Sequence, residues 1–382
     1  MRRQFNCRLL TISIAIVLLV LGSTLHLCPS PSGIPRPLDT GIMNEAVGRK
    51  DDSVGQRKVS GKHDYEAHRP SCELSNLLET EPPHRSANIS VRVDRWIRNA
   101  NAVLSCPHQA AIMSSSSLTV PDVIHRIWEC DEIPGRYEPS LKSWEENAPG
   151  MVILLWTEKL RKEFVSKHLG TEKLMLYERL VPGSYRADLF KYIIMYHVGG
   201  IYSDLDSYLL VNFSNLKFLR EGTTLAIDLD PRRLLPGAIL MAPREEAVFV
   251  CAMGEVFDHS YQRTYFGSDL SGSLDVSGPG VLGECVRHML GRDTISFRPG
   301  NEGLANMKFR LLHSHLEDGI HTIELEGGVD IVSLQHGGQS YDRQVSSRCD
   351  PGEHYSALYS KNKVYRFENR SWPQRQQLGF RV

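Results

Sequence analysis

The chain has 382 residues, a formal net charge of −1 and a hydrophobic share of 41%. Its 44 Lys and Arg residues are balanced by 45 Asp and Glu residues and form no cluster, which argues against a nucleic-acid-binding surface. This length is enough for two domains, but the first third does not resemble an ordinary folded domain, because apolar residues between Pro29 and about Arg85 are too scattered to form a core.

The N-terminus predicts a single-pass membrane anchor. Three arginines in residues 1–8, the predicted cytosolic tail, precede an uncharged and mostly aliphatic run at residues 9–27. A helix of this length crosses a bilayer core of about 30 Å, and the positive flank favours a type II orientation with the remaining chain in the lumen. A cleaved signal peptide is the alternative. It is disfavoured because the apolar run is long and ends in a poor cleavage site at Leu25–Leu27.

Residues 28–117 are predicted to form a stem. Most of this segment is rich in Pro, Ser, Gly and charged residues and is expected to be flexible. Within it, Val93, Trp96 and Ala100 recur at helical spacing, which predicts an amphipathic helix at residues 89–104 that docks on the main domain. The compact domain is predicted to span residues 118–382.

The cysteines and the glycosylation sequons are consistent with a location in the lumen of the secretory pathway. No cysteine spacing resembles a zinc site, so some cysteines are expected to form disulfides, although the pairing cannot be deduced. The cysteines that would meet an oxidising lumen are Cys72, Cys106, Cys130, Cys251, Cys285 and Cys349. The sequons are hypotheses of the same weight and lie at Asn88, Asn212 and Asn369.

Strand and helix patterns alternate after residue 118, which predicts a mainly parallel sheet covered on both faces. The predicted strands are Val123–Trp128, Val152–Trp156, Ile201–Asp206, Leu225–Asp228, Ala238–Met241, Ile295–Phe297 and Val329–Ser333. The predicted helices are Leu141–Asn147, Lys159–His168 and Asp188–His197. Ligands of open α/β sheets bind outside the carboxyl ends of strands, where Trp128, Asp204 and Asp206 fall.

The segment from Arg186 to Asp206, RADLFKYIIMYHVGGIYSDLD, combines a helix, a glycine stop and a short strand. Apolar spacing predicts a helix with one packed face, leaving Asp188 and Lys191 off that face. Two consecutive glycines then end the helix, and a β-favouring strand follows. The strand would deliver two carboxylates to its polar end.

Asp204 and Asp206 at that end suit a metal-bound diphosphate. Their oxygens are ligands for hard cations such as Mn²⁺ or Mg²⁺, which stabilise a departing nucleoside diphosphate as Lewis acids. A second Asp-x-Asp, Asp228 and Asp230, runs into a proline turn where carboxylates can simply bond backbone. The first pair is therefore favoured as the metal or donor site.

Six segments occur in the order found in glycosyltransferase family 32, which this chain resembles. They are VPDVIHRIWE (120–129), SWEENAPG (143–150), ILLW (153–156), RADLFKY (186–192), GGIYSDLD (199–206) and SGPGVL (277–282). The resemblance implies one catalytic domain with a nucleotide-sugar-binding, Rossmann-like mixed sheet of the GT-A type. It further implies retaining transfer of a hexose, with mannose favoured over galactose or N-acetylglucosamine, onto a glycan or glycolipid, usually with manganese.

The resemblance also assigns roles to single residues. Asp206 would ligate the metal, and Asp204 would contact ribose and metal-bound water; both are the catalytic candidates. The other donor-binding candidates are Trp128, which would stack on the base, and Arg186, Asp188, Lys191, Tyr202, Ser371 and Trp372. Relatives often carry Arg where this chain has Lys191, and Lys cannot form the same bidentate contact. Ordinary packing is the alternative for Trp128, and a solvated helix face is the alternative for Asp188 and Lys191.

The C-terminal segment departs from the family pattern. A histidine expected before Ser371 and Trp372 is absent, and Glu368 is the candidate third metal ligand, which excludes a glycan at Asn369. Gly237 also stands where an asparagine is common. The spare histidines, each favoured as structural, are His125, His313, His315 and His336.

The expected location is the Golgi or ER membrane, and a complex with other glycosyltransferases is a further expected partnership. The departures leave open a degenerate, non-catalytic or lectin-like subunit. An aspartyl phosphatase is less favoured because Gly199 and Gly200 interrupt the long apolar strand that its motif needs.

Overall fold

The computed structural model describes residue 78 and the ranges 88–106, 119–227, 238–267, 270–291, 300–302, 309–317, 320–325, 328–334 and 355–366. The chain divides into two units, residues 1–65 and 66–382, and every described residue belongs to the second. The predictions that lie outside the described residues are the anchor at 9–27, the strand at 295–297, Asp228, Asp230, Gly237, His336, Glu368, Asn369, Ser371, Trp372 and the side chain of His313. No helix within the described ranges is long and apolar enough to span a membrane.

The helices, with the 3₁₀ helices written η, are α3 (Ile89–Ser105), η2 (Gly135–Tyr137), α5 (Glu138–Asn147), α6 (Glu158–Leu169), α7 (Thr171–Arg179), α8 (Gly183–His197), η3 (Phe213–Arg220), α9 (Ala247–Gln262), α10 (Leu270–Leu274), α11 (Pro279–Met289) and α12 (Tyr355–Ser360). The strands are β1 (Val123–Ile127), β2 (Val152–Trp156), β3 (Gly200–Ser203), β4 (Ser207–Leu209), β5 (Thr223–Ile227), β6 (Ile239–Ala242), β7 (Gly300–Glu302), β8 (Phe309–Glu317), β9 (Ile320–Leu325) and β10 (Val329–Leu334).

The strands form one mixed sheet in the order β2-β1-β3-β6-β5-β8-β9-β10-β4, with β7 beside β8. Strand β1 pairs in parallel with β2 and β3, and β5 pairs in parallel with β8, whereas the other pairs are antiparallel. The predicted mixed α/β fold is confirmed. The expectation of a mainly parallel sheet is wrong, because β8, β9 and β10 follow one another as antiparallel neighbours instead of through crossover helices.

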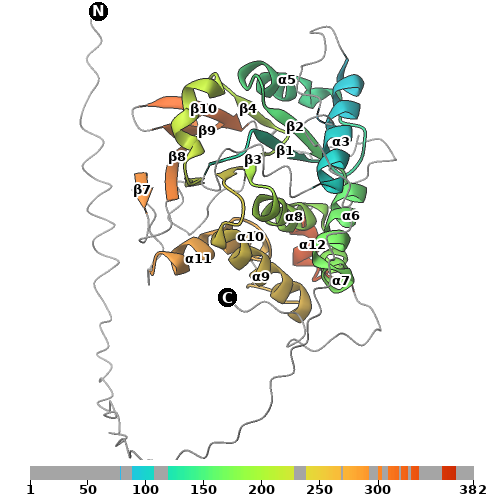
Figure 1. Ribbon diagram of the computed structural model, residues 1–382. Helices are drawn as coiled ribbons and strands as arrows, with labels where there is room; N and C mark the ends of the chain where they lie inside the picture. Colours follow the sequence, from blue (N-terminus) through green and yellow to red (C-terminus); the bar gives the residue numbers. More distant parts are fainter. Residues whose placement is uncertain are drawn as a thin grey trace, which may run out of the picture. The chain divides into compact units, whose positions relative to one another are not determined.

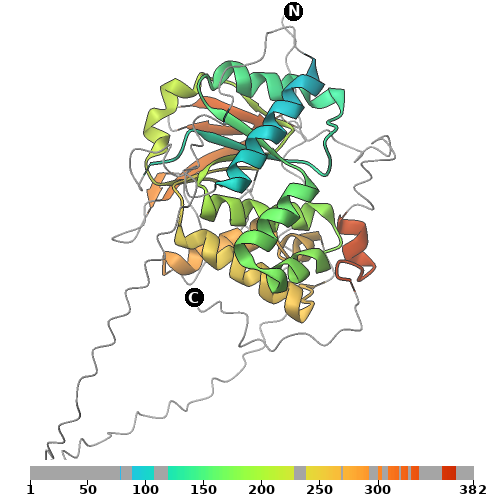
Figure 2. The same cartoon turned by 45° about the vertical axis from the view of Figure 1, so that its right-hand side comes forward.

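Alternate residues of β2, the strand at one end of the sheet, enter two separate cores. Leu154 and Trp156 of β2 face helices α6, α8 and α9, whereas Ile153 and Leu155 face α5 and η3. This alternation is the two-residue period of a strand, and it means that both faces of this part of the sheet are covered. Figures 1 and 2 show α6 to α9 grouped below the sheet and α5 on its other side.

The helix predicted at residues 89–104 is confirmed as α3 and lies against β2. Asn88 caps its N-terminus, since its Oδ1 accepts a hydrogen bond of 3.1 Å from the Val91 N–H. Trp96 is fully buried, and Arg95 makes an ion pair of 2.6 Å with Glu145 of α5. The expected docking of this helix on the domain is therefore observed.

Helix α8 differs from its prediction because it has no solvated face along its central turns. Lys191 is only 4% exposed, and the apolar residues on either side of it are buried too. The helix contacts α6, α7 and α9 as well as β3, so one packed face is not enough. The chain then turns through Gly199 and Gly200 at φ 70° and 105°. A Cβ on Gly199 would lie 2.6 Å from the Arg244 backbone nitrogen, so glycine is required there.

Four of the six cysteines that were expected to meet an oxidising lumen are disulfide-bonded, and Cys72 and Cys349 lie outside the described residues. A disulfide between Cys251 and Cys285 joins α9 to α11. Cys106, directly after α3, and Cys130 are also disulfide-bonded.

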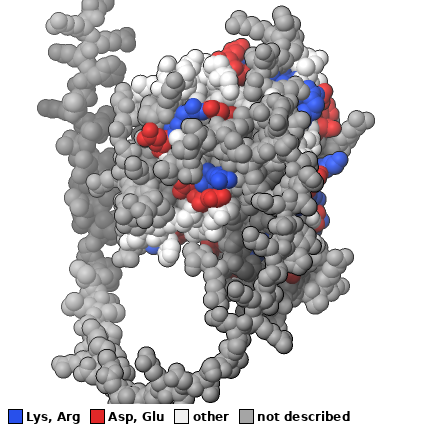
Figure 3. Space-filling model, viewed as in Figure 1, with Lys and Arg blue, Asp and Glu red and all other residues white. Residues whose placement is uncertain are grey.

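On the face shown in Figure 3, acidic and basic side chains of the described residues alternate instead of gathering by sign.

Candidate functional site

The two carboxylates lie in a turn at the carboxyl end of β3. The strand ends at Ser203 and β4 begins at Ser207, so the predicted strand to Asp206 is three residues too long. The turn is closed by a hydrogen bond of 3.1 Å from the Ser207 N–H to the Asp204 carbonyl oxygen. A further bond of 2.9 Å, from the Asp204 N–H to the Ala238 carbonyl, ties the turn to the segment before β6.

This turn closes a curl in the sheet. Although β3 and β4 are separated by three residues, β3 is an inner strand and β4 is the last strand of the path, paired with β10. The strands between them must therefore curve back toward the turn. Apolar residues from both ends of the path, including Ile201, Leu209 and Val332, share one buried core. The position of the carboxylates is thus fixed by the packing of the whole curled sheet.

Arg126, in the middle of β1, holds the turn from inside the protein. Its guanidinium is fully buried and its Nη1 donates to the carbonyl oxygens of Ser203, at 3.3 Å, and Asp204, and to the Ser207 hydroxyl at 3.1 Å. The guanidinium also lies 4.9 Å from the centre of the Trp144 ring. Burial lowers the pKa of Arg126 to about 10, so this side chain is still charged at neutral pH beside the two aspartates.

Helix α5 holds the same turn from the other side. The Trp144 indole N–H donates to the Ser207 carbonyl at 2.9 Å, and Asn147 donates to the Leu209 carbonyl at 2.8 Å. Ser140 donates to the Leu205 carbonyl, within the turn itself. Trp144 and Asn147 of the SWEEN segment therefore attach α5 to the turn and to β4.

Asp204 lies in an electrostatic setting that disfavours its charge. Burial, followed by repulsion from Asp206, raises the pKa of Asp204 to about 6. The Tyr202 hydroxyl donates a hydrogen bond of 2.5 Å to Asp204 Oδ1. Burial raises the pKa of Tyr202 well above its usual value, so this phenol remains a donor.

Asp188 and Lys191 extend this network from α8. Lys191 Nζ donates to Asp188 Oδ1 at 2.6 Å, and the Ser277 hydroxyl donates to Asp188 Oδ2 at 3.1 Å. The same ammonium group lies 5.7 Å from the centre of the Tyr202 ring, so α8 and β3 meet through these side chains. The interpretation as a solvated helix residue is excluded for Lys191, which is buried, whereas Asp188 is partly exposed and has two hydrogen-bond partners.

The acidic pair fits a divalent cation. Two carboxylates in one turn supply hard oxygen ligands, and their mutual repulsion is the strain that a bound cation would relieve. Asp204 and Asp206 are the described residues that would hold it. When bound, such an ion supplies positive charge to a leaving diphosphate.

Trp128 directly follows β1, the parallel neighbour of β3, so it emerges at the same sheet edge as Asp204. Its indole N–H donates to the Glu132 carbonyl at 2.9 Å, and its ring meets Tyr137 edge-on with centroids 5.4 Å apart. The ring is partly exposed, so it has a defined orientation and accessible surface.

Arg186 lies in a separate ionic cluster at the start of α8. Its Nε is 2.9 Å from Glu158, and its Nη1 donates to two backbone carbonyls, both at 2.7 Å. The fully buried Arg161 pairs with Glu158 and Glu129, each at 2.9 Å. Since Glu129 follows Trp128, this cluster connects the end of β1 to α6 and α8. These contacts place the Arg186 guanidinium in a cluster separate from the acidic turn, and its donor-binding role stays a prediction.

Two contributors were missed from the sequence. Arg126 could have been noticed as a charged residue inside an otherwise apolar strand, a pattern that indicates a buried partner. Ser277 carries no comparable signal, because its contact with Asp188 spans 89 positions. His125 is structural, as expected: its Nε2 lies 2.7 Å from the Gly199 carbonyl, and its Nδ1 accepts from the Trp156 indole at 3.1 Å.

Residues 134–221 match the family model for the glycosyltransferase sugar-binding region containing a DXD motif. This range includes α5, α8 and the acidic turn. The chain is 35% identical over 95 residues to inositol phosphoceramide mannosyltransferase 3 of Schizosaccharomyces pombe, covering 25% of this chain and 26% of that protein. It is 29% identical over 87 residues to the mannosyl phosphorylinositol ceramide synthase SUR1 of Saccharomyces cerevisiae, covering 23% and 22%. The chain thus spans about a quarter of the length of these relatives.

The solved structure of the PaToxG glycosyltransferase aligns with 52% of this chain and 80% of its own, at a TM-score of 0.36 and 14% identity. A score of this size does not define a shared fold.

Proposed function

We propose that this protein transfers a hexose from a nucleotide sugar to a glycan or glycolipid. The premise is that residues 134–221 belong to the glycosyltransferase family whose sugar-binding region contains a DXD motif. Mannose is the favoured sugar because the curated relatives are mannosyltransferases of inositol phosphoceramide. The proposed catalytic domain spans residues 118–382 and faces the Golgi or ER lumen behind the anchor at residues 9–27.

One observation carries the proposal: Asp188, Lys191, Tyr202 and Asp204 form a connected network at the acidic turn. The contacts run from the Asp188–Lys191 pair, through the Lys191 ammonium beside the Tyr202 ring, to the hydrogen bond between Tyr202 and Asp204. Asp206 adds the second carboxylate, close enough to raise the pKa of Asp204. A site for a sugar diphosphate needs this combination of a cation-binding end and polar groups for hydroxyls.

Each side chain of the site has a proposed role that follows from its position. Asp206, with Asp204, would bind Mn²⁺ or Mg²⁺, and Tyr202 keeps the Asp204 carboxylate oriented. Asp188 is a carboxylate held on both oxygens, so it can accept hydrogen bonds from sugar hydroxyls in a fixed direction. Trp128 offers an accessible ring to the base at the same edge of the sheet.

Retention of anomeric configuration is the proposed stereochemistry. It is supported by the family resemblance and by the contacts of one described carboxylate. Asp188 is already committed to Lys191 and Ser277, which suits a binding role better than nucleophilic attack. The anomer of the first product, followed by NMR before mutarotation, tests this point.

A donor screen tests the function. Parent protein and Asp206→Ala are incubated with GDP-mannose, UDP-galactose and UDP-N-acetylglucosamine, with Mn²⁺ or with EDTA, and released nucleoside diphosphate is measured. The expected result is Mn²⁺-dependent release from GDP-mannose by the parent and none above blank by the variant. Inositol phosphorylceramide is the first acceptor to add, because it occurs in the names of the relatives.

Release at the blank rate from every donor, with and without acceptor, would instead support a degenerate binding subunit. Equal release by parent and variant would show that the acidic turn has been assigned wrongly.

A further inference from the structure

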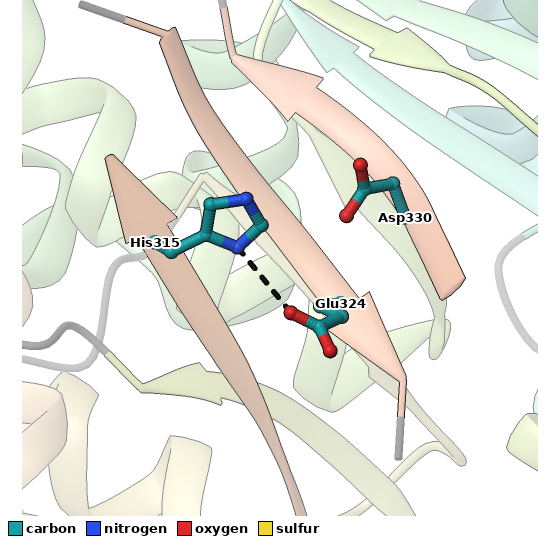
Figure 4. A group of neighbouring side chains, drawn as sticks. All are labelled: His315, Glu324 and Asp330. Carbon is teal, nitrogen blue, oxygen red and sulfur yellow. Dashed lines mark ion pairs between the residues drawn. The ribbon is translucent and has the colours of Figure 1, made fainter. Parts of the chain in front are cut away.

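Three potential metal ligands lie close together on the antiparallel strands β8, β9 and β10, outside the acidic turn. Figure 4 shows His315 on β8, Glu324 on β9 and Asp330 on β10, side by side on three neighbouring strands. His315 Nδ1 lies 3.4 Å from Glu324 Oε2. One ligand atom from each residue lies within 4.8 Å of the other two.

The strand register explains why these side chains meet. Glu324 is the direct cross-strand partner of Asp330, and His315 is paired with Thr322, two residues from Glu324. Direct partners and diagonal neighbours project from the same face of an antiparallel sheet. The register of β10 shifts between Asp330 and Val332, and the intervening Ile331 is fully buried together with Val332. The irregularity therefore directs two consecutive apolar residues inward and leaves Asp330 outside.

The register also creates an unfavourable feature. Glu324 and Asp330 are like charges directly opposite each other, an arrangement that destabilises a sheet. A divalent cation between the three side chains would offset this repulsion.

From this geometry we propose that His315, Glu324 and Asp330 form a second divalent-cation site, of the class that binds Zn²⁺. One imidazole nitrogen and two carboxylate oxygens are a donor set that zinc uses, at ligand distances of about 2.0–2.2 Å. Three atoms no more than 4.8 Å apart can all lie within about 2.8 Å of a common point, so small side-chain rotations complete the site. Asp330 is exposed, which leaves room for water as a further ligand.

This site is separate from the acidic turn. The end of β10 that pairs with Ser207 is Leu334, four residues from Asp330 along the strand. At about 3.3 Å per residue, that separation is roughly 13 Å. A cation there would tie β8, β9 and β10 together, and β10 in turn pairs with β4 beside the turn. The proposed role is therefore to stabilise the curled sheet, not to bind donor.

The test uses the full chain carrying Asp204→Asn and Asp206→Asn, so that the acidic turn does not contribute. Zn²⁺ binding is measured by calorimetry, and Co²⁺ is used as the spectroscopic probe of a mixed nitrogen and oxygen site. We expect one Zn²⁺ per chain and a raised melting temperature on Zn²⁺ addition. Affinity should fall by at least about tenfold in Glu324→Gln and in Asp330→Asn and more in His315→Gln.

Glu255→Gln is the matched control. Glu255 is exposed and lies 3.7 Å from His259 on α9, a His–Glu pair to which no third ligand is added among the described residues. Its removal should leave Zn²⁺ affinity unchanged, and circular dichroism checks that each variant is folded. Absence of Zn²⁺ binding by the background chain, or equal affinity in the three ligand variants and the control, would overturn the proposal. Neither readout depends on donor turnover, so failure of this site and failure of the proposed function are distinguishable.

Discussion

Lys191 Nζ lies 2.6 Å from Asp188 Oδ1, one turn apart on α8, and the same ammonium group lies 5.7 Å from the centre of the Tyr202 ring. This ion pair connects the helix to the strand that carries the acidic turn. Lys191 is only 4% exposed, so its charge is kept inside the protein by these partners.

Replacement of Lys191 by Met should lower kcat/KM. The change keeps the length of the side chain but leaves Asp188 without its charged partner, a loss of about 1.5–3 kcal/mol for a hydrogen bond to a charged group. In the proposed function, this corresponds to a fall in kcat/KM of roughly tenfold to a hundredfold. Lys162→Met, at a half-exposed position of α6, is the control and should retain parental kinetics. Equal kcat/KM in Lys191→Met and parent would remove Lys191 from the site.

Trp144→Phe should loosen the acidic turn. It deletes the hydrogen bond from the indole to the Ser207 carbonyl while keeping most of the ring, so about 0.5–1.5 kcal/mol of stability should be lost with a reduced kcat. Trp96→Phe is the matched control. Trp96 is equally buried, and its indole nitrogen has no hydrogen-bond partner among the described residues.

Only Trp144→Phe should change the Mn²⁺ concentration that gives half-maximal activity, because only this residue contacts the turn. A similar shift in both variants would mean that general loss of core packing, and not the hydrogen bond to Ser207, is responsible.

Asp204→Asn should stabilise the metal-free protein. The folded-state pKa of Asp204 is raised to about 6, so ionisation of this group costs stability as the pH rises through that value. In EDTA at pH 7.5, the variant should melt at a higher temperature than the parent, and the difference should shrink below pH 5. Added Mn²⁺ should raise the melting temperature of the parent more than that of the variant. A variant that melts below the parent in EDTA at pH 7.5 would contradict this description of the turn.

His125 should make the protein sensitive to acid. Burial lowers its pKa to about 4, so the folded state resists protonation while the unfolded state takes up a proton near pH 6.5. The stability from this group is present above pH 6.5 and is lost as the pH falls toward 4. Between pH 7.5 and 5, the free energy of unfolding should fall by about 2 kcal/mol through His125.

Denaturant unfolding at both pH values, with parent and His125→Gln, measures this contribution. The opposing effect of Asp204 is common to both proteins and cancels in the difference. The variant should be less stable at pH 7.5 but should lose less stability on acidification. His288→Gln, exposed on α11, should behave like the parent, and an unchanged slope in His125→Gln would argue against a neutral buried imidazole.

Local sequence patterns were sufficient to predict those elements whose structure depends mainly on their own residues. The strand Val152–Trp156 was predicted with its observed bounds because its apolar run acts locally. The helix Asp188–His197 was predicted with its observed end, at the glycine stop, but it begins five residues earlier, at Gly183. The grouping of Asp188, Lys191, Tyr202, Asp204 and Asp206 followed from one continuous segment, and the structure brings these residues together.

Long-range packing could not be predicted in the same way. The burial of Lys191 depends on helices that surround α8, and the curl that places β4 beside β10 depends on hairpins a hundred residues later. Arg126 illustrates the difference, since its partners Ser203 and Ser207 lie in contact only because β1 and β3 are neighbours. The third metal ligand, proposed as Glu368, lies outside the described residues and stays a prediction.

The most direct test of the central claim is the affinity for nucleoside diphosphate as a function of Mn²⁺ concentration, measured by calorimetry with GDP and UDP. Parent protein, Asp206→Asn and the exposed-surface control Glu255→Gln are compared at pH 7.5. If Asp204 and Asp206 hold the cation that binds the diphosphate, Mn²⁺ should raise the affinity of parent and control by at least about tenfold. Asp206→Asn should show no such increase. An Mn²⁺ response in Asp206→Asn equal to that of the parent would contradict the account.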